Sequence, residues 1–133
     1  MDAQELGRIP LFSDLAEDDL NALATYADEV TVSEGKHLVD EGGYAYDLFA
    51  IIDGQAQVIV GGDVVAELGP GDFFGEAGVL EKQQRNATVV AKTRMRLVTL
   101  TAWDLRRMRR QLGPVMEKLE AAIEHRRNPV AES

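Results

Sequence analysis

The chain has 133 residues, no cysteine and a formal net charge of −9 at pH 7. This length supports one hydrophobic core but leaves little room for a second, and the lack of cysteine excludes disulfides, a thiol nucleophile and cysteine-ligated metals. The negative charge argues against nucleic acid as the main partner. No stretch reaches the roughly 20 apolar residues of a membrane helix, and no signal segment opens the chain, so we expect a cytoplasmic protein without membrane insertion.

The charge is unevenly distributed along the chain. Residues 1–101 carry 18 acids against seven basic residues, a net of −11, whereas residues 102–127 carry a net of +3. A solvated helix with cations toward its C-terminal end accounts for the basic segment, because cations there complement the helix dipole. The alternative is a docking surface for an acidic partner or for the acidic part of the same molecule.

Residues 1–27 have the features of a helical lead-in. Ser13 is a candidate N-cap, and the acids at 17–19 suit the first turn of a helix. An uneven apolar face at helical spacing accompanies them, formed by Leu15, Leu20, Leu23, Ala24 and Ala27. We therefore expect helix in this segment.

The periodicity changes between residues 28 and 101. Short apolar or alternating stretches are separated by turn signals such as Gly61-Gly62-Asp63, and Asp53-Gly54 is a two-residue hairpin signal. Residues 87–91 and 94–100 are expected to form the last strand pair. Several short strands with close turns predict a mainly β fold, an antiparallel jelly-roll barrel or sandwich with flanking helices.

The stretch at 71–88 contains the candidate site. Gly75 lacks a Cβ, so its backbone can approach a ligand closely. A helical turn at 76–80 would direct unpaired N–H groups and partial positive charge toward a phosphate. Arg85 would add a charged planar fork for the same anion, and Glu76 could accept hydrogen bonds from sugar hydroxyls. Together these groups predict a site for a nucleotide with a single phosphate; the alternative is a surface turn with a capping Glu and an Arg on a strand edge.

This stretch resembles the phosphate-binding cassette of cyclic nucleotide-binding domains. The residues that match the family pattern are Phe74-Gly75-Glu76, Gly78, Val79-Leu80, Arg85 and Ala87-Thr88. Three residues depart from it: Ala77 replaces a larger aliphatic residue, Gln84 replaces proline and Asn86 replaces a small residue. The resemblance extends from about Leu11 to about Ile123. It implies one such domain over residues 1–127, with a helical lead-in at 1–27, a barrel at 28–101, helices at 102–127 and a loose tail at 128–133.

The resemblance also implies which residues contact the ligand. The set around phosphate and ribose is Gly75, Glu76, Ala77, Arg85, Asn86 and Ala87. The phosphate would dock on the amides of residues 75–77 and on Arg85, and Glu76 would accept from the ribose 2′-hydroxyl. We expect cyclic AMP as the ligand, with cyclic GMP less favoured, because no threonine follows the arginine; the amide of Asn86 carries both donors and an acceptor. In the family, the loop before the strand at 48–52 also leans over the ribose and phosphate.

From Ala102 the periodicity is helical again. Thr101 can cap a first helix, Gly113-Pro114 breaks it, and a second helix is expected from Val115 to about His125. The apolar stripe of the second helix comprises Val115, Met116, Leu119, Ala122 and Ile123. Packing against the barrel or a sister helix explains this stripe. In the family such a helix closes over the base and often dimerises, which makes Met116, Leu119 and Ile123 candidate lid residues and allows a homodimer through this helix.

The resemblance implies a regulatory module and not an enzyme. Ligand binding would move the C-terminal helix, and an unidentified effector domain or protein would read that movement, whether the chain is a whole protein or an excised domain. Neither catalysis nor a metal is expected, because His37 and His125 are far apart in sequence and lie in no cluster at metal-ligand spacing. The alternative is a degenerate barrel that mediates protein contacts without binding nucleotide.

Overall fold

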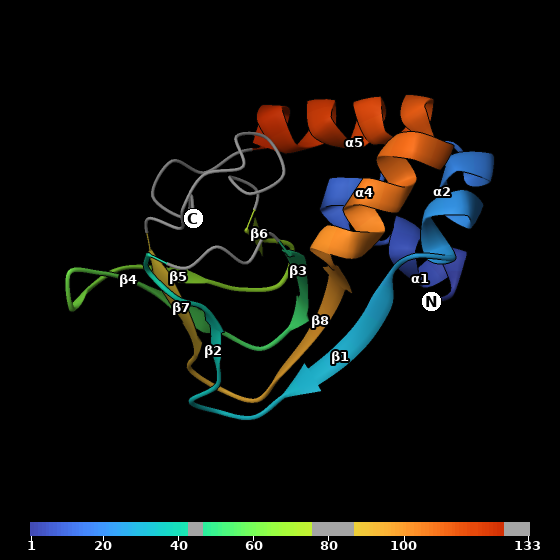
Figure 1. Ribbon diagram of the computed structural model, residues 1–133. Coiled ribbons are helices and arrows are strands. Elements are labelled where there is room, and N and C mark those ends of the chain that lie inside the picture. Colours follow the sequence, from blue (N-terminus) through green and yellow to red (C-terminus); the bar gives the residue numbers. More distant parts are fainter. Residues whose placement is uncertain (43–46, 76–86, 127–133) are drawn as a thin grey trace.

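The computed structural model describes residues 1–42, 47–75 and 87–126, in which helices at both ends of the chain flank two β-sheets (Figure 1). The N-terminal helical elements are α1 (Ala3–Gly7), the 3-10 helix η1 (Pro10–Phe12) and α2 (Glu17–Ala24). The strands are β1 (Asp28–Val32), β2 (His37–Val39), β3 (Leu48–Asp53), β4 (Ala56–Val60), β5 (Asp63–Leu68), β6 (Phe73–Phe74), β7 (Thr88–Ala91) and β8 (Met95–Leu100). The C-terminal helices are α4 (Ala102–Gln111) and α5 (Gly113–Arg126).

The strands form two antiparallel sheets that pack face to face. One sheet has the order β1-β8-β3-β6 and the other has the order β2-β7-β4-β5. The first strand pairs with the last, with Asp28 opposite Thr99, so the two ends of the β region meet in one sheet. This arrangement confirms the predicted antiparallel jelly-roll fold with flanking helices.

Strands β8, β3 and β6 of the first sheet contribute buried side chains to both of its faces, whereas β1 at its edge is largely exposed. Ile51, Phe74 and Leu97 face the other sheet and form the barrel cluster with its apolar side chains. Their chain neighbours Ala50, Phe73 and Val98 face the opposite way and belong to a second cluster with the helices. Figure 1 shows this helical layer on the outer face of the sheet. Because side chains alternate between the faces of a strand, both sets must be apolar, and β8 is apolar over most of its length.

Two of the predicted strand connections are wrong. Asp53-Gly54 does not close a hairpin, because β3 and β4 belong to different sheets and the chain crosses between them. Likewise β7 and β8 are not a pair: β7 lies between β2 and β4, and β8 lies between β1 and β3. The two-residue hairpin is at Gly61-Gly62, with φ angles of 59° and 88° and Val60 paired to Asp63. Positive φ at both central residues is the geometry that matches the twist of the flanking strands.

The boundaries of the helices follow from local capping. Thr101 caps α4 as predicted: its hydroxyl accepts from the Asp104 N–H at 3.1 Å, and the Asp104 carboxylate accepts from the Thr101 N–H. The predicted cap at Ser13 is wrong. The Ser13 hydroxyl donates to the Pro10 carbonyl at 2.9 Å, and α2 begins only at Glu17. No helix in the described ranges has both the length and the apolar character needed to cross a bilayer.

Gly54 and Gly62 provide a matched test of the crossing between sheets. Both have left-handed φ angles, 94° and 88°. A Cβ on Gly54 would lie 2.5 Å from the Arg94 carbonyl oxygen, whereas one on Gly62 would meet nothing within 4 Å. We expect Gly62→Ala to lower the free energy of unfolding by about 1–2 kcal/mol through backbone strain, and Gly54→Ala to lower it by a further ~1–3 kcal/mol through the clash. Urea denaturation measures both, and equal losses would contradict the structure at the crossing.

Candidate functional site

Two of the predicted site residues, Gly75 and Ala87, are described by the structure and are buried, and we call them the two fixed points. Gly75 directly follows β6 and is buried, and Ala87 directly precedes β7 and is 1% exposed. Ala87 belongs to the barrel cluster, as does Phe74, the chain neighbour of Gly75. The structure therefore places Phe74 and Ala87, on the two sides of residues 76–86, in the same core. Glu76, Ala77, Arg85 and Asn86 lie outside the described residues, and their roles stay predictions.

The first fixed point is set by aromatic packing and a left-handed residue. The rings of Phe49 and Phe74 stack with centroids 5.0 Å apart and an angle of 18° between their planes, and the two residues pair between β3 and β6. Gly75 follows with a φ of 87°, a conformation that disfavours any residue with a Cβ. The backbone after β6 therefore has a conformation that glycine adopts at a lower energetic cost than residues with a Cβ.

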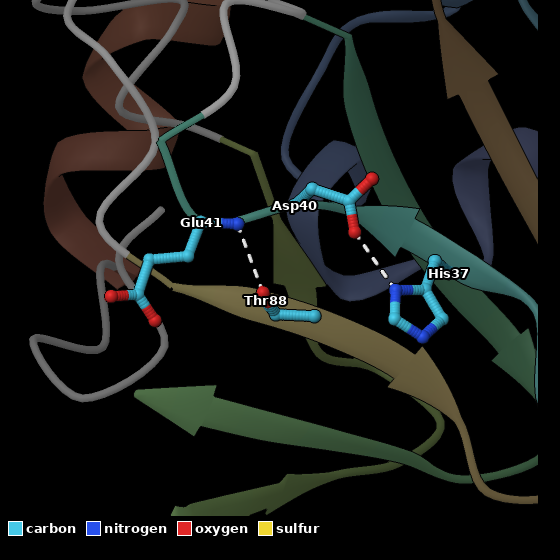
Figure 2. Close-up of polar contacts among 4 residues, drawn as sticks. All are labelled: His37, Asp40, Glu41 and Thr88. Atoms are coloured by element: carbon cyan, nitrogen blue, oxygen red, sulfur yellow. Dashed lines mark hydrogen bonds and ion pairs between the residues drawn. The ribbon is translucent and has the colours of Figure 1, made fainter. Parts of the chain in front are cut away.

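The second fixed point is bound to the loop after β2. The Glu41 N–H donates to the Thr88 hydroxyl oxygen at 2.9 Å, and the Glu41 carboxylate accepts from the Gly61 N–H at 3.1 Å. Figure 2 shows the side chains of Asp40 and Glu41 pointing away from one another, with Asp40 directed to His37 and 2.8 Å between Asp40 Oδ1 and His37 Nδ1. The main chain at Glu41 is thus held against the start of β7. This loop is the one expected to lean over the ligand, and neither Glu41 nor Thr88 had been assigned a role from the sequence.

The candidate lid residues lie elsewhere. Met116, Leu119 and Ile123 are each at most 1% exposed and pack with the N-terminal helices in the helical cluster. Two ion pairs add to this contact: Lys118 Nζ lies 2.7 Å from Asp19 Oδ2, and an Arg126 guanidinium nitrogen lies 3.5 Å from Asp14 Oδ2. The structure therefore does not bring the apolar stripe of α5 together with Gly75 and Ala87, and the lid role stays a prediction.

The C-terminal end of α5 nevertheless lies near β6. A hollow is lined by Arg126 of α5 and by Leu68, Gly71, Asp72 and Phe73, which lead through β6 to Gly75. Figure 1 also shows the C-terminal end of α5 on the side of the molecule where β6 lies.

Among the described residues, two ionisable groups have clearly shifted pKa values, and both lie outside the candidate stretch. The hydrogen bond from Lys92 lowers the pKa of Glu67, and the hydrogen bond to Glu29 raises the pKa of Arg96; all four side chains are surface groups outside the candidate stretch. In the ranges that the structure covers, no three His, Cys, Asp or Glu side chains are grouped so that they could hold a metal ion.

The comparisons with known proteins agree with the fold and with the sequence pattern. The family described as "Cyclic nucleotide-binding domain" matches residues 29–111, which include the whole candidate stretch. This chain belongs to the cyclic nucleotide-binding domain family.

Relatives of known sequence support this assignment, and a solved structure shares the fold. The chain is 35% identical to a cAMP-dependent protein kinase regulatory subunit of Yarrowia lipolytica, over 86% of this chain and 30% of that protein. It is 29% identical to the cyclic AMP receptor protein of Thermus thermophilus, over 88% of this chain and 56% of that protein. A crystal structure of a putative cyclic nucleotide-binding protein from Geobacter metallireducens has the same fold, with a TM-score of 0.78 and 21% identity over 96% of this chain and 99% of that one. The chain thus spans 30% of the length of the kinase regulatory subunit and 56% of that of the receptor protein.

Replacing Thr88 tests the bond that holds the loop. Thr88→Val keeps the shape of the side chain but removes the acceptor for the Glu41 N–H, so we expect a loss of about 0.5–1.5 kcal/mol in the free energy of unfolding. The Glu41 amide should also exchange its hydrogen faster. Thr88→Ser keeps the oxygen and serves as the control. Unchanged exchange at Glu41 in Thr88→Val would show that the bond does not hold the loop.

Proposed function

We infer that this chain is a regulatory module that binds a cyclic nucleotide, with cyclic AMP preferred. The observation that carries this proposal is the family match over residues 29–111 together with the Gly75-Glu76 pair and Arg85 at the family spacing. In this proposal the phosphate lies on the amides of residues 75–77 and on Arg85. Glu76 accepts from the ribose 2′-hydroxyl, and Asn86 and Ala87 flank the phosphate.

Two observations favour cyclic AMP over cyclic GMP. The relatives with the matching sequence include a cAMP-dependent kinase regulatory subunit and a cyclic AMP receptor protein. In addition, Asn86 and not threonine follows Arg85, so the hydroxyl that accompanies cyclic GMP preference in the family is missing. One hydrogen-bonding group that is paired with one base and unpaired with the other contributes about 1–3 kcal/mol, which gives a preference and not exclusivity.

The regulatory step in this proposal is a displacement of α5. Phe73 packs with the helices and Phe74 packs in the barrel, so β6 connects the ligand-binding side of the molecule to the layer that contains α5. A ligand can shift this equilibrium only through different affinities for the two arrangements. An effector domain or protein would read the displacement.

The burial of α5 limits how this displacement can occur. Met116, Leu119 and Ile123 are fully buried, and each such side chain contributes about 1.5–3 kcal/mol when it is removed from water. Exposing all three would therefore oppose ligand binding by several kcal/mol. The helix can act as a lid only if the same side chains are buried again, against the base or against α5 of a second copy.

A second candidate is a barrel that has lost its ligand and mediates protein contacts. The presence of both Glu76 and Arg85 favours nucleotide binding, because a surface without a ligand would have no use for this pair at this spacing. Titration of the purified chain with both nucleotides separates these two functions.

Replacing Arg85 tests the proposed phosphate site. By isothermal titration calorimetry we expect the chain to bind cyclic AMP more tightly than cyclic GMP, and Arg85→Ala to weaken cyclic AMP binding by roughly 2–5 kcal/mol through loss of a charge-assisted contact. Arg94→Ala removes an exposed arginine of the turn before β8 and is the matched control. Wild-type affinity in Arg85→Ala would refute the site, and no binding of either nucleotide to the wild type would favour the degenerate barrel.

Removing an ion pair between α5 and the N-terminal helices tests the regulatory step. Lys118→Gln removes the ion pair with Asp19 and should make displacement of α5 easier, so the affinity for cyclic AMP should rise by up to about fivefold, the upper range for a single exposed ion pair. Lys36→Gln changes the net charge equally at an exposed turn remote from α5 and is the control. An affinity that is unchanged or lower in Lys118→Gln, relative to this control, would argue against displacement of α5 from Asp19.

A further inference from the structure

The exposed face of α4 carries a tryptophan among arginines. Trp103, the single tryptophan of the chain, is 62% exposed. Arg106, Arg107 and Arg110 follow it at spacings of three, four and seven residues, which places all four side chains along one side of the helix. We name these four residues the Trp103 stripe. With Arg109 they line a hollow on the surface, while Leu105 and Met108 of the same helix are buried in the core.

The positive charges of the stripe are not neutralised by the acids of the described chain. The Arg106 guanidinium lies 5.9 Å from the centre of the Trp103 ring, and that of Arg107 lies 5.1 Å from the Tyr26 ring. Among the residues that the structure describes, the ion pair of α4 is between Arg109 and Glu120 at 2.6 Å, and none joins the stripe to a carboxylate. The stripe is therefore a local cationic and aromatic surface on a chain of net charge −9.

Stability of the helix alone does not account for this composition. Cations in the last turn complement the helix dipole, which explains Arg109 and Arg110. Arg106 lies earlier in the helix, and like charges at a spacing of four residues, as in Arg106 and Arg110, destabilise a helix. An exposed indole ring adds apolar surface in contact with water. The combination is instead typical of the residues that carry binding energy in protein interfaces, where tryptophan and arginine are enriched.

We propose that the Trp103 stripe docks an acidic segment of a partner protein. Guanidinium groups bind carboxylates with two parallel hydrogen bonds, and the indole ring offers an apolar plane for a neighbouring side chain of that segment. From Trp103 to Arg110 the stripe is about 10 Å long, the length of about three extended residues. The partner therefore needs a short cluster of Asp or Glu with one apolar side chain. This docking surface does not depend on nucleotide binding.

Charge decides against an extended polyanion as the occupant. Residues 1–101 carry a net charge of −11, and electrostatic interactions reach about 8 Å at physiological ionic strength. A nucleic acid or an anionic bilayer extends well beyond the stripe and would meet the repulsion of this acidic remainder. A short acidic segment can lie within the range of the stripe alone.

The binding experiment uses eight-residue fluorescein-labelled peptides of Asp and Glu with one Leu or Phe placed at each position in turn. Anisotropy of the label measures affinity, and the emission of Trp103 in titrations with the unlabelled peptides reports directly whether the stripe is covered. The same peptides with Lys in place of the acids, a thymidine oligonucleotide and phosphatidylserine vesicles are run in parallel. We expect at least one acidic peptide to bind, to shift the Trp103 emission to shorter wavelength and to bind more weakly as salt is added.

Matched charge reversals locate the binding surface. R106E/R110E and R94E/K36E change the net charge by the same amount, the first pair on the stripe and the second at exposed turns of the barrel. We expect the first variant to weaken the peptide by at least about tenfold and the second to change it less than about twofold. Arg106→Gln with Arg110→Gln replaces the first variant if circular dichroism shows that it does not fold. Equal losses in both variants, tighter binding of the oligonucleotide or the vesicles than of every peptide, or no binding of any acidic peptide up to about 1 mM would each overturn the proposal.

Discussion

Burial of strands β8, β3 and β6 on both faces of their sheet is the constraint on which the rest of the structure depends. One face forms the barrel interior with the other sheet, and the opposite face is covered by the helices from the two ends of the chain. Phe73 and Phe74 are consecutive residues in different clusters, so two β-strand residues join the barrel to the helical layer. Removing the helices would leave one face of this sheet exposed to water, so the helical segments are part of the core and not an addition to it.

The fold was predictable where the deciding contacts are local. The capping box of Thr101 and Asp104 spans four residues, and the Gly61-Gly62 turn joins strands that are adjacent in sequence, so both could be read directly. Asp53-Gly54 has the same local signal as a hairpin turn. Its actual role depends on which sheet each flanking strand joins, and its glycine is required by the distant carbonyl of Arg94, which no local pattern contains.

The site was predictable in its residue pattern but not in its supports. Gly75 and Ala87 were identified from the sequence, and the positive φ of Gly75 and the burial of Ala87 give a physical reason for both residue types. The bond from Glu41 to Thr88 joins residues 47 positions apart and involves a main-chain N–H, so it has no signature in residue identity. The α5 stripe was read correctly as apolar, yet periodicity does not say which surface covers it; here that surface is the N-terminal helices.

The pairing of β1 with β8 has a consequence for how the molecule acquires its structure. Asp28 pairs with Thr99, at the opposite end of the β region in sequence. Strands β3 and β7 also pair with strands from distant parts of the chain. Non-local pairing must first overcome loop-closure entropy, so folding of such a topology is slow compared with that of a helical bundle of similar size. The β4–β5 hairpin can form early, whereas both edges of β1 stay unpaired until β8 is in place. The interval before that closure is the period in which this chain is most exposed to aggregation through its strand edges.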